Sequence, residues 1–289
     1  MFFQLRAIHL ANDSVLLAPN ANVALNAGTW NYTEGNPPRT NFVNAGGQIY
    51  LDPGALINVA GSTGVAVPVT QNILAVELRG SELADSPLQR EGLFRGLTIQ
   101  VDARNTGTFN GLMWVGTPLA DVTGFANLIE RTVGELTTAG GTVRLTAGGS
   151  VVMQRGSTVD ASGGWIDFDG GMVETTRVIL GNRVLDIAQV TPDLLYNGIY
   201  TGTFTRSFAK YGITETFTNP LRLGAAHFEE SYIQGANGGT IAISAPAMAL
   251  DGALLGHTVA VHLASYVPRT ERGAQSAATA LGGVLAAAR

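Results

Sequence analysis

The stretch that decides the fold is Gly140-Gly141-Thr142-Val143-Arg144-Leu145, because the chain repeats its pattern twice. A glycine pair followed by a polar, an apolar, a variable and a second apolar residue also occurs at Gly46–Leu51 and at Gly238–Ile243. Apolar residues at every second position are typical of a β-strand that buries one face. Three copies of one strand-forming phrase indicate an internal repeat, which favours a solenoid over an ordinary globular domain.

A second phrase follows the first two copies. Pro53–Gly61 reads Pro-Gly-Ala-Leu-Ile-Asn-Val-Ala-Gly and aligns without gaps with Arg155–Gly163, which reads Arg-Gly-Ser-Thr-Val-Asp-Ala-Ser-Gly. Ser150–Met153 alternates as a further short strand, and Asp13–Gly28 has the strand, turn, strand rhythm of another coil. One coil buries too few apolar side chains to offset its loss of backbone entropy. The stable object is therefore expected to be a stack of coils.

The alternation also predicts which side chains point into the stack. Glycines are expected at the corners of the coils, where the backbone needs φ > 0 or a close approach to another segment. We expect Ile49, Val143 and Ile241 to occupy equivalent places in successive coils. The outward set is Gln48, Tyr50, Asn58, Arg144 and Asp160. The inward set is Ile49, Leu51, Ile57, Val59, Val143, Leu145, Val151, Met153, Val159, Ile241 and Ile243.

Other segments are inserted between the coils, because the three glycine pairs begin at positions 46, 140 and 238. Such gaps are far longer than the roughly 20–50 residues of one solenoid repeat. We expect residues 1–259 to form the solenoid, with insertions at about 69–135 and 166–236. Apolar residues at helical spacing in Pro118–Leu136 predict a short helix, and the aromatic second insertion predicts a hairpin or lobe.

The Ala-rich segment 260–289 departs from the repeat. It lacks the full glycine-pair phrase and ends in the small, mostly apolar stretch 276–289. Three alternatives remain open for it: a small capping helix, a disordered end, or a segment foreign to the repeat. We treat it as a C-terminal tail or cap.

The composition favours an all-β protein. Hydrophobic residues make up 45% of the chain and charged residues 13%, and glycine is abundant at 37 residues. An average soluble domain has about 25% charged residues, so neutral polar residues must cover much of this surface. The net charge is −5 and no basic stripe is visible, which argues against a nucleic-acid partner. Cysteine is absent, which excludes disulfides and thiolate metal sites, and no apolar run is long enough to predict a transmembrane segment.

The phrases at 140–153 and 156–164 resemble the large exoproteins of the filamentous haemagglutinin family. The resemblance extends chiefly over 13–64, 140–165 and 238–259. It implies a right-handed parallel β-helix, so the expected fold is an all-β solenoid of this kind with the inserted extra-helical segments and one or two short helices inferred above. It also implies a secreted or cell-surface protein, associated with the outer membrane and exported by an outer-membrane partner transporter.

One departure from this family bears on where the chain belongs. The Asn-Pro motifs of the family's amino-terminal secretion domain have no clear counterpart, since Asn219-Pro220-Leu221 lies in the middle of the chain. The first ten residues also lack the sustained apolar core of a signal peptide. The chain is therefore expected to be an internal segment of a longer exoprotein.

Two sets of residues are candidates for function. Tyr196, Tyr200, Phe204 and Phe208 form the aromatic set, whose rings could stack on sugars at a ligand surface or form a local core. The acidic set comprises Asp160, Asp167, Asp169 and Glu174. Asp167 and Asp169 could supply two oxygen ligands to Ca²⁺, which needs about six, so a solvated turn is the expectation for this pair.

The histidines add no catalytic motif. His227–Glu230 offers an imidazole beside carboxylates without the spacing of a zinc protease, and a structural role is expected for all four histidines. The sequence predicts no metal ligand set, no cofactor and no catalytic residue.

The function expected from this reading is a structural and adhesive segment of an exoprotein that contacts carbohydrate or a host or partner surface. The alternative is a β-helical carbohydrate-active enzyme, a polysaccharide lyase or hydrolase, since that architecture hosts both kinds of protein. Hydrolysis would need two carboxylates at defined separation, and the acidic set is the one group near a coil that offers them.

Overall fold

The protein is mostly β, with 48% of its residues in strands and 9% in helices. The computed structural model describes residues 1–260, except 36, 38 and 219–225, together with 284–288. The chain divides into two compact units. We call residues 1–66, 131–168 and 232–289 the sheet unit, and residues 67–130 and 169–231 the insert unit.

Three parallel sheets make up the sheet unit. The first holds, in hydrogen-bonded order, β1 (Phe2–Leu5), β4 (Asn22–Ala27), β14 (Thr142–Ala147), β26 (Thr240–Ser244) and β29 (Val284–Ala288). The second holds β2 (Ala7–Leu10), β7 (Gln48–Leu51), β15 (Ser150–Met153) and β27 (Ala247–Leu250). The third holds β3 (Val15–Leu17), β8 (Leu56–Asn58), β16 (Thr158–Asp160) and β28 (Ala253–Leu255).

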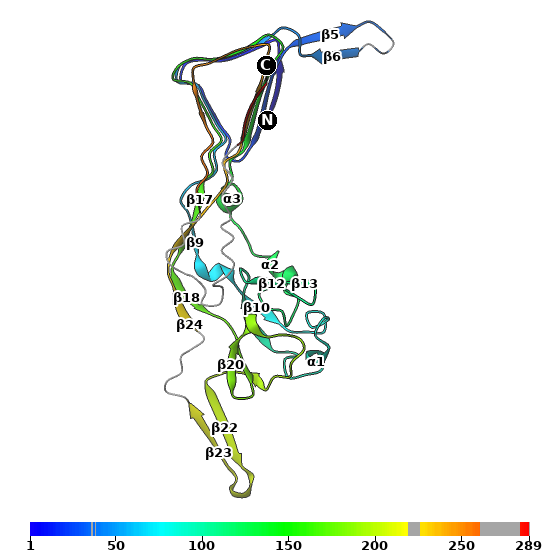
Figure 1. Cartoon of the computed structure of the whole chain (residues 1–289), viewed down its shortest axis with the longest axis vertical. Coiled ribbons are helices and arrows are strands. Elements are labelled where there is room, and N and C mark those ends of the chain that lie inside the picture. Colours follow the sequence, from blue (N-terminus) through cyan, green and yellow to red (C-terminus); the bar gives the residue numbers. More distant parts are fainter. Residues whose placement is uncertain (36, 38, 219–225, 261–283, 289) are drawn as a thin grey trace. The chain divides into compact units, whose positions relative to one another are not determined.

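The chain visits these sheets in turn, so each pass contributes one strand to every sheet. The four complete passes are β1–β2–β3, β4–β7–β8, β14–β15–β16 and β26–β27–β28. Figure 1 views the sheet unit along the stack, and its passes overlie one another around a three-sided outline. Every pass buries the inner face of its neighbour and completes its ladder of hydrogen bonds.

The predicted inward face is confirmed. All eleven inward residues belong to one hydrophobic core cluster, and none of them is more than 4% exposed. Of the outward set, Gln48 and Arg144 are exposed, while Tyr50, Asn58 and Asp160 are half-buried. The alternation was a sufficient guide because a strand's side-chain direction depends only on its own period of two.

The equivalence of the repeated phrases needs one correction. Val143 pairs with Ile241 and Ile57 with Val159, as the phrases predict. Ile49, however, pairs with Val151, because β7 lies in the sheet of β15 and not in the sheet of β14. A glycine pair also precedes β15, so the same pattern introduces strands of two different sheets within one pass. The phrase alone cannot distinguish them.

The end of the chain contributes one more strand. β29 extends the first sheet in parallel, with Ile241 opposite Leu285. Residues 284–288 of the segment treated as a tail or cap therefore adopt strand structure, while residues 261–283 lie outside the described part. Its place in the order of the first sheet follows that of β26, the first strand of the preceding pass.

The sheet unit also carries strands outside the three sheets. β5 (Thr29–Thr33) and β6 (Arg39–Val43) form an antiparallel hairpin between β4 and β7. β9 (Val65–Pro68), β17 (Trp165–Asp169) and β25 (Tyr232–Gly235) form a small sheet in which β17 and β25 are antiparallel. The helix α3 (Val133–Leu136) begins with a capping box between Thr132 and Glu135.

Two insertions from successive passes fold together in the insert unit. Its core combines residues of the first insertion, such as Phe94 and Val101, with residues of the second, such as Val178 and Ile187. The strands from the first insertion are β10 (Ile73–Glu77), β11 (Thr98–Asp102), β12 (Thr106–Phe109) and β13 (Leu112–Val115). Those from the second are β18 (Gly171–Glu174), β19 (Arg177–Leu180), β20 (Arg183–Asp186), β21 (Gly198–Ile199), β22 (Thr203–Phe208), β23 (Ile213–Thr218) and β24 (Ala226–Glu229).

The helices differ from the sequence-based expectation. In place of one helix in Pro118–Leu136 there are two separate turns, α2 (Thr123–Ala126) and α3, and α1 (Pro87–Arg90) is a third. Val122 is buried whereas Leu128 and Val133 are each 77% exposed, so the apolar residues at helical spacing do not form one buried face.

The 3₁₀ turns are η1 (Val69–Asn72), η2 (Ile187–Gln189) and η3 (Ala209–Tyr211). A bilayer requires about 20 helical residues, and no described helix meets the requirement for a membrane span.

Candidate functional site

The aromatic set does not form one surface. Tyr196 is 7% exposed, and its ring contacts Phe94 edge-on at a centroid distance of 5.9 Å. Its hydroxyl donates to the Thr191 carbonyl at 2.9 Å and accepts from the Thr191 amide at 2.8 Å. Tyr196 is therefore a core residue of the insert unit, because its ring is enclosed and its polar atom is satisfied.

The other three aromatic residues lie further along the same insertion. Tyr200 is half-buried directly after β21. Phe204 and Phe208 both lie on β22, whose antiparallel partner β23 places Phe217 opposite Phe204 and Ile213 opposite Phe208. Without Tyr196, the aromatic set is therefore reduced to Tyr200, which follows β21, and to two residues of β22.

The acidic set is divided among three strands. Asp160 lies on β16, Asp167 and Asp169 lie on β17, and Glu174 lies on β18. An Asp160 carboxylate oxygen accepts from the Ser162 amide at 2.8 Å. Asn58, at the equivalent place in the preceding pass, accepts from the Ala60 amide at 2.9 Å. Asp160 therefore shapes a coil corner, as its equivalent does.

A metal site is also not formed in the part of the chain that the structure describes. There, no three or more His, Asp or Glu side chains gather closely enough to hold an ion. Asp167 and Asp169 alone supply too few oxygens for Ca²⁺.

Glu229 takes part in an ion-pair network. Its carboxylate, 8% exposed, accepts hydrogen bonds from both terminal nitrogens of Arg104, one of them at 2.7 Å. Arg104 also donates to both carboxylate oxygens of Asp102, at 3.0 and 2.7 Å. The network links β11 of the first insertion to β24 of the second. His227, on β24 as well, is exposed. Glu229 is therefore a structural residue.

Arg104→Ala should destabilise the insert unit by about 2 kcal/mol, because the partly buried carboxyl groups of Asp102 and Glu229 would lose their hydrogen-bonding cation. The Arg104 side chain is 33% exposed, so solvent screening reduces the effect below that of a fully buried pair. Hydrogen exchange at β11 and β24 should report the loss. The matched control is Arg79→Ala, which removes an exposed pair with Glu77 and should leave exchange unchanged. Equal effects of both variants would contradict the assignment.

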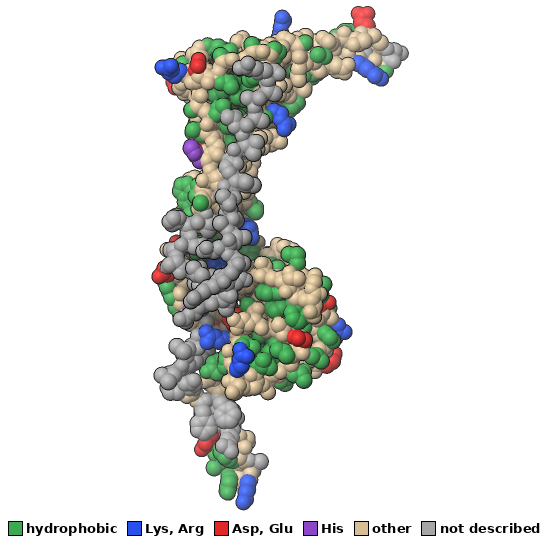
Figure 2. All heavy atoms as spheres, in the orientation of Figure 1, with side chains coloured by type: hydrophobic (Ala, Val, Ile, Leu, Met, Phe, Trp, Pro, Cys, Tyr) green, Lys and Arg blue, Asp and Glu red, His purple; other side chains and the backbone are tan. Residues whose placement is uncertain are grey.

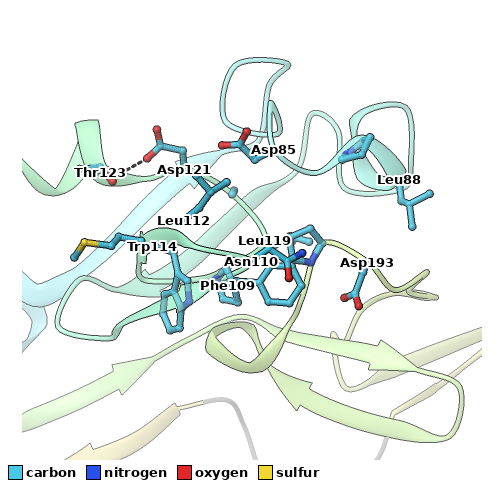
Figure 3. Close-up of a pocket in the computed structure, with 15 residues that line it drawn as sticks. Asp85, Leu88, Phe109, Asn110, Leu112, Trp114, Leu119, Asp121, Thr123 and Asp193 are labelled. Carbon is cyan, nitrogen blue, oxygen red and sulfur yellow. Dashed lines mark hydrogen bonds between the residues drawn. The ribbon is translucent and has the colours of Figure 1, made fainter.

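An apolar pocket of about 540 Å³ in the insert unit is a further candidate site. Figure 3 shows its walls coming from several segments of the chain. The ring-bearing wall is the β12–β13 hairpin, and the other walls are the segments around α1, before α2 and after η2. The lining residues are Asp85, Pro87, Leu88, Phe109, Asn110, Leu112, Met113, Trp114, Pro118, Leu119, Ala120, Asp121, Thr123, Pro192 and Asp193.

The β12–β13 hairpin is built by local sequence. Asn110 and Gly111, with φ of 48° and 82°, form its two-residue turn. Asn-Gly is the preferred pair where both central residues need φ > 0. Trp114 lies opposite Gly107, and a Cβ on Gly107 would meet the indole at 2.5 Å. The absence of a side chain at Gly107 therefore lets the indole lie across the neighbouring strand.

Three carboxylates and no cationic side chain line the pocket. One oxygen of Asp121 accepts from the Thr123 amide at 3.0 Å, and Figure 3 shows Asp193 apart from Asp85 and Asp121. Ion pairs between described residues include none of these three carboxylates. The pocket thus combines an apolar floor with a negative rim.

The loop that leads into α1 is held by Glu82. Its carboxylate accepts from the Arg79 amide and the Ser81 hydroxyl, both at 2.9 Å, and its carbonyl accepts from the Asp121 amide at 2.8 Å. Partial burial raises the pKa of Glu82, but hydrogen bonds from its own amide, from Ser81 and from Arg79 outweigh burial, so the pKa is lowered overall. Glu82 stays ionised and connects the segments that carry Asp85 and Asp121.

This pocket was not predicted from the sequence. One signal for it was present, because Asn110-Gly111 between alternating stretches predicts a hairpin. The convergence of that hairpin with segments near positions 85, 120 and 192 has no local signature.

No protein-family model, no curated protein and no solved structure matches this chain. The geometry alone therefore defines its class. It is a mostly β protein in which one unit contains three parallel sheets and the other carries an open apolar pocket with an acidic rim.

Proposed function

We propose that the chain is a segment of a right-handed parallel β-helix from a secreted or cell-surface exoprotein, and that its role is structural and adhesive. The observation that carries the proposal is the parallel register of equivalent residues in successive passes. Val23, Val143 and Ile241 lie side by side in the first sheet, and the other two sheets repeat this arrangement. Right-handed crossovers are the rule for parallel strands joined within one sheet, which supports the proposed hand.

The position of the two insertions supports a displayed binding unit. The first insertion lies in the sequence between β8 and β14, and the second lies between β16 and β26. Both fold into a unit with its own core instead of extending the three sheets. Segments that carry function commonly emerge from a rigid scaffold in this manner. Glycans or proteins of a host or partner surface are the proposed contacts, and an outer-membrane transporter is the proposed route of export.

The test is saturable binding of the intact chain to cultured cells. We expect binding that falls when the cells are treated with protease or with glycosidases, and no chemical change in the bound material. Val143→Asp provides the control, because an unfolded sheet unit should not support specific binding. If the intact chain binds cells no better than this control, the adhesive role is contradicted.

The alternative function is a carbohydrate-active enzyme with the same scaffold. Three carboxylates beside an aromatic ring in one pocket favour retaining it, since glycoside hydrolysis uses paired carboxylates. The distinguishing assay incubates the chain with neutral and acidic polysaccharides. Release of reducing ends or of unsaturated products would establish the enzyme and displace the adhesive proposal.

A further inference from the structure

We propose that the pocket of the insert unit binds a short peptide segment that carries both apolar and cationic side chains. This names the contact site of the displayed unit, and in that respect it rests on the proposed function. The inference follows from the size of the pocket, its exposed apolar walls and the sign of the charge on its rim.

The size of the pocket suits side chains rather than a flat surface. Its volume of about 540 Å³ falls within the range of roughly 300–1,000 Å³ typical of ligand sites. A cavity of this size accommodates one or two large apolar side chains together with the backbone between them.

The apolar walls are exposed to an unusual degree. Leu88 is 48% exposed, Leu112 is 56% exposed and Met113 is 86% exposed, all beside the half-buried ring of Trp114. Figure 2 shows hydrophobic side chains gathered on the visible surface of this unit. Exposed apolar residues that cluster at a pocket mark interaction sites, and the flexible Met side chain adapts to varied partners.

The negative charge of the rim favours a ligand with positive charge. Asp85, Asp121 and Asp193 contribute three negative charges, and no Arg or Lys lines the pocket. An ammonium or guanidinium group would be attracted by these carboxylates and by the face of Trp114. Sulfated or sialylated glycans would instead be repelled, so the contact with acidic carbohydrate is disfavoured at this site.

A peptide fits the walls better than a sugar does. The hydroxyls of a buried sugar ring need hydrogen-bond partners, because an unsatisfied polar group is costly. Apart from the carboxylates, the lining side chains offer three polar groups, which are the Asn110 amide, the Thr123 hydroxyl and the indole N–H of Trp114. Leucine and methionine side chains, by contrast, complement apolar peptide side chains without such a requirement.

The direct test uses a fluorescein-labelled hexapeptide, Lys-Leu-Phe-Lys-Leu-Arg, and its counterpart in which every cation is replaced by Glu. The full chain should bind the cationic peptide with a Kd in the micromolar range, and the acidic peptide at least about tenfold more weakly. Raising the salt concentration from 50 to 500 mM should weaken binding several-fold, because the attraction is electrostatic at the rim.

Variants locate the binding in the pocket. Trp114→Ala should raise the Kd about tenfold, and Asp121→Asn and Asp193→Asn should each raise it several-fold. Met113→Ser is a second pocket variant, needed because Trp114→Ala could disturb the hairpin. Met113 is exposed, so its replacement should preserve the fold and still weaken peptide binding. Trp30→Ala is the matched control: Trp30 is a half-exposed tryptophan on β5 of the sheet unit and should leave the Kd unchanged.

The outcomes separate this inference from the proposed function. Equal binding of both peptides, binding that the pocket variants leave unchanged, or stronger binding of chitosan oligosaccharides would overturn the peptide assignment. Cell binding that survives Trp114→Ala and Met113→Ser would overturn the pocket as the contact site while leaving the adhesive role intact. Peptide binding without any cell binding would overturn the adhesive role while leaving the pocket as a peptide-binding site.

Discussion

Val143→Asp should unfold the sheet unit. Val143 is fully buried in the middle of the first sheet, between Val23 of the preceding pass and Ile241 of the following one. A carboxylate at this place would have no cation or donor, and burying such a group costs about 4 kcal/mol or more. Because each pass depends on its neighbours, the loss should spread through the stack. Circular dichroism during denaturant unfolding measures it.

Arg144→Asp is the matched control for this variant. Arg144 is the next residue of the same strand, and it points outward into solvent. The new carboxylate would be hydrated there, so the denaturation midpoint should change little. Similar destabilisation by both substitutions would mean that β14 does not have one buried and one exposed face.

Gly239→Ala is the second substitution with a large expected effect. Gly239 stands at the corner before β26, where a Cβ would lie 1.8 Å from the Gly141 carbonyl oxygen of the preceding pass. No Cβ tolerates such an approach, so the two passes would have to separate. We expect a loss of about 3 kcal/mol or more, in the upper range for overpacking, because backbone atoms on both sides resist displacement.

Gly124→Ala is the control for the steric effect of Gly239→Ala, because it makes the same substitution at an uncrowded glycine. No atom lies within 4 Å of a Cβ built on Gly124, which is part of α2. Alanine is favoured over glycine in a helix by up to about 1 kcal/mol, so this variant should be neutral or slightly stabilising. Differential scanning calorimetry compares the two. An unchanged transition for Gly239→Ala would show that the passes are not in close contact at this corner.

The sequence by itself determined the strand faces and much of the stack. The eleven inward residues could be identified because alternation is a local property that the chain carries wherever the strand lies. The gapless second phrase also paired Ile57 with Val159 correctly, because it occurs once in each of the two passes that carry it. The repeated glycine phrase failed for Ile49, since the pattern introduces strands in two sheets of the same pass.

Only the tertiary structure decided what the insertions do. Tyr196 and Trp114 are both aromatic residues in β-rich insertions, yet Tyr196 is enclosed beside Phe94 while Trp114 lines an open pocket. Arg104 and Glu229 meet across 125 residues of chain. Such pairings depend on which segments pack together, and the free energy of that packing comes from contacts that no local period encodes. The scaffold is therefore predictable from short-range pattern, whereas the pocket and its charge follow from long-range contact.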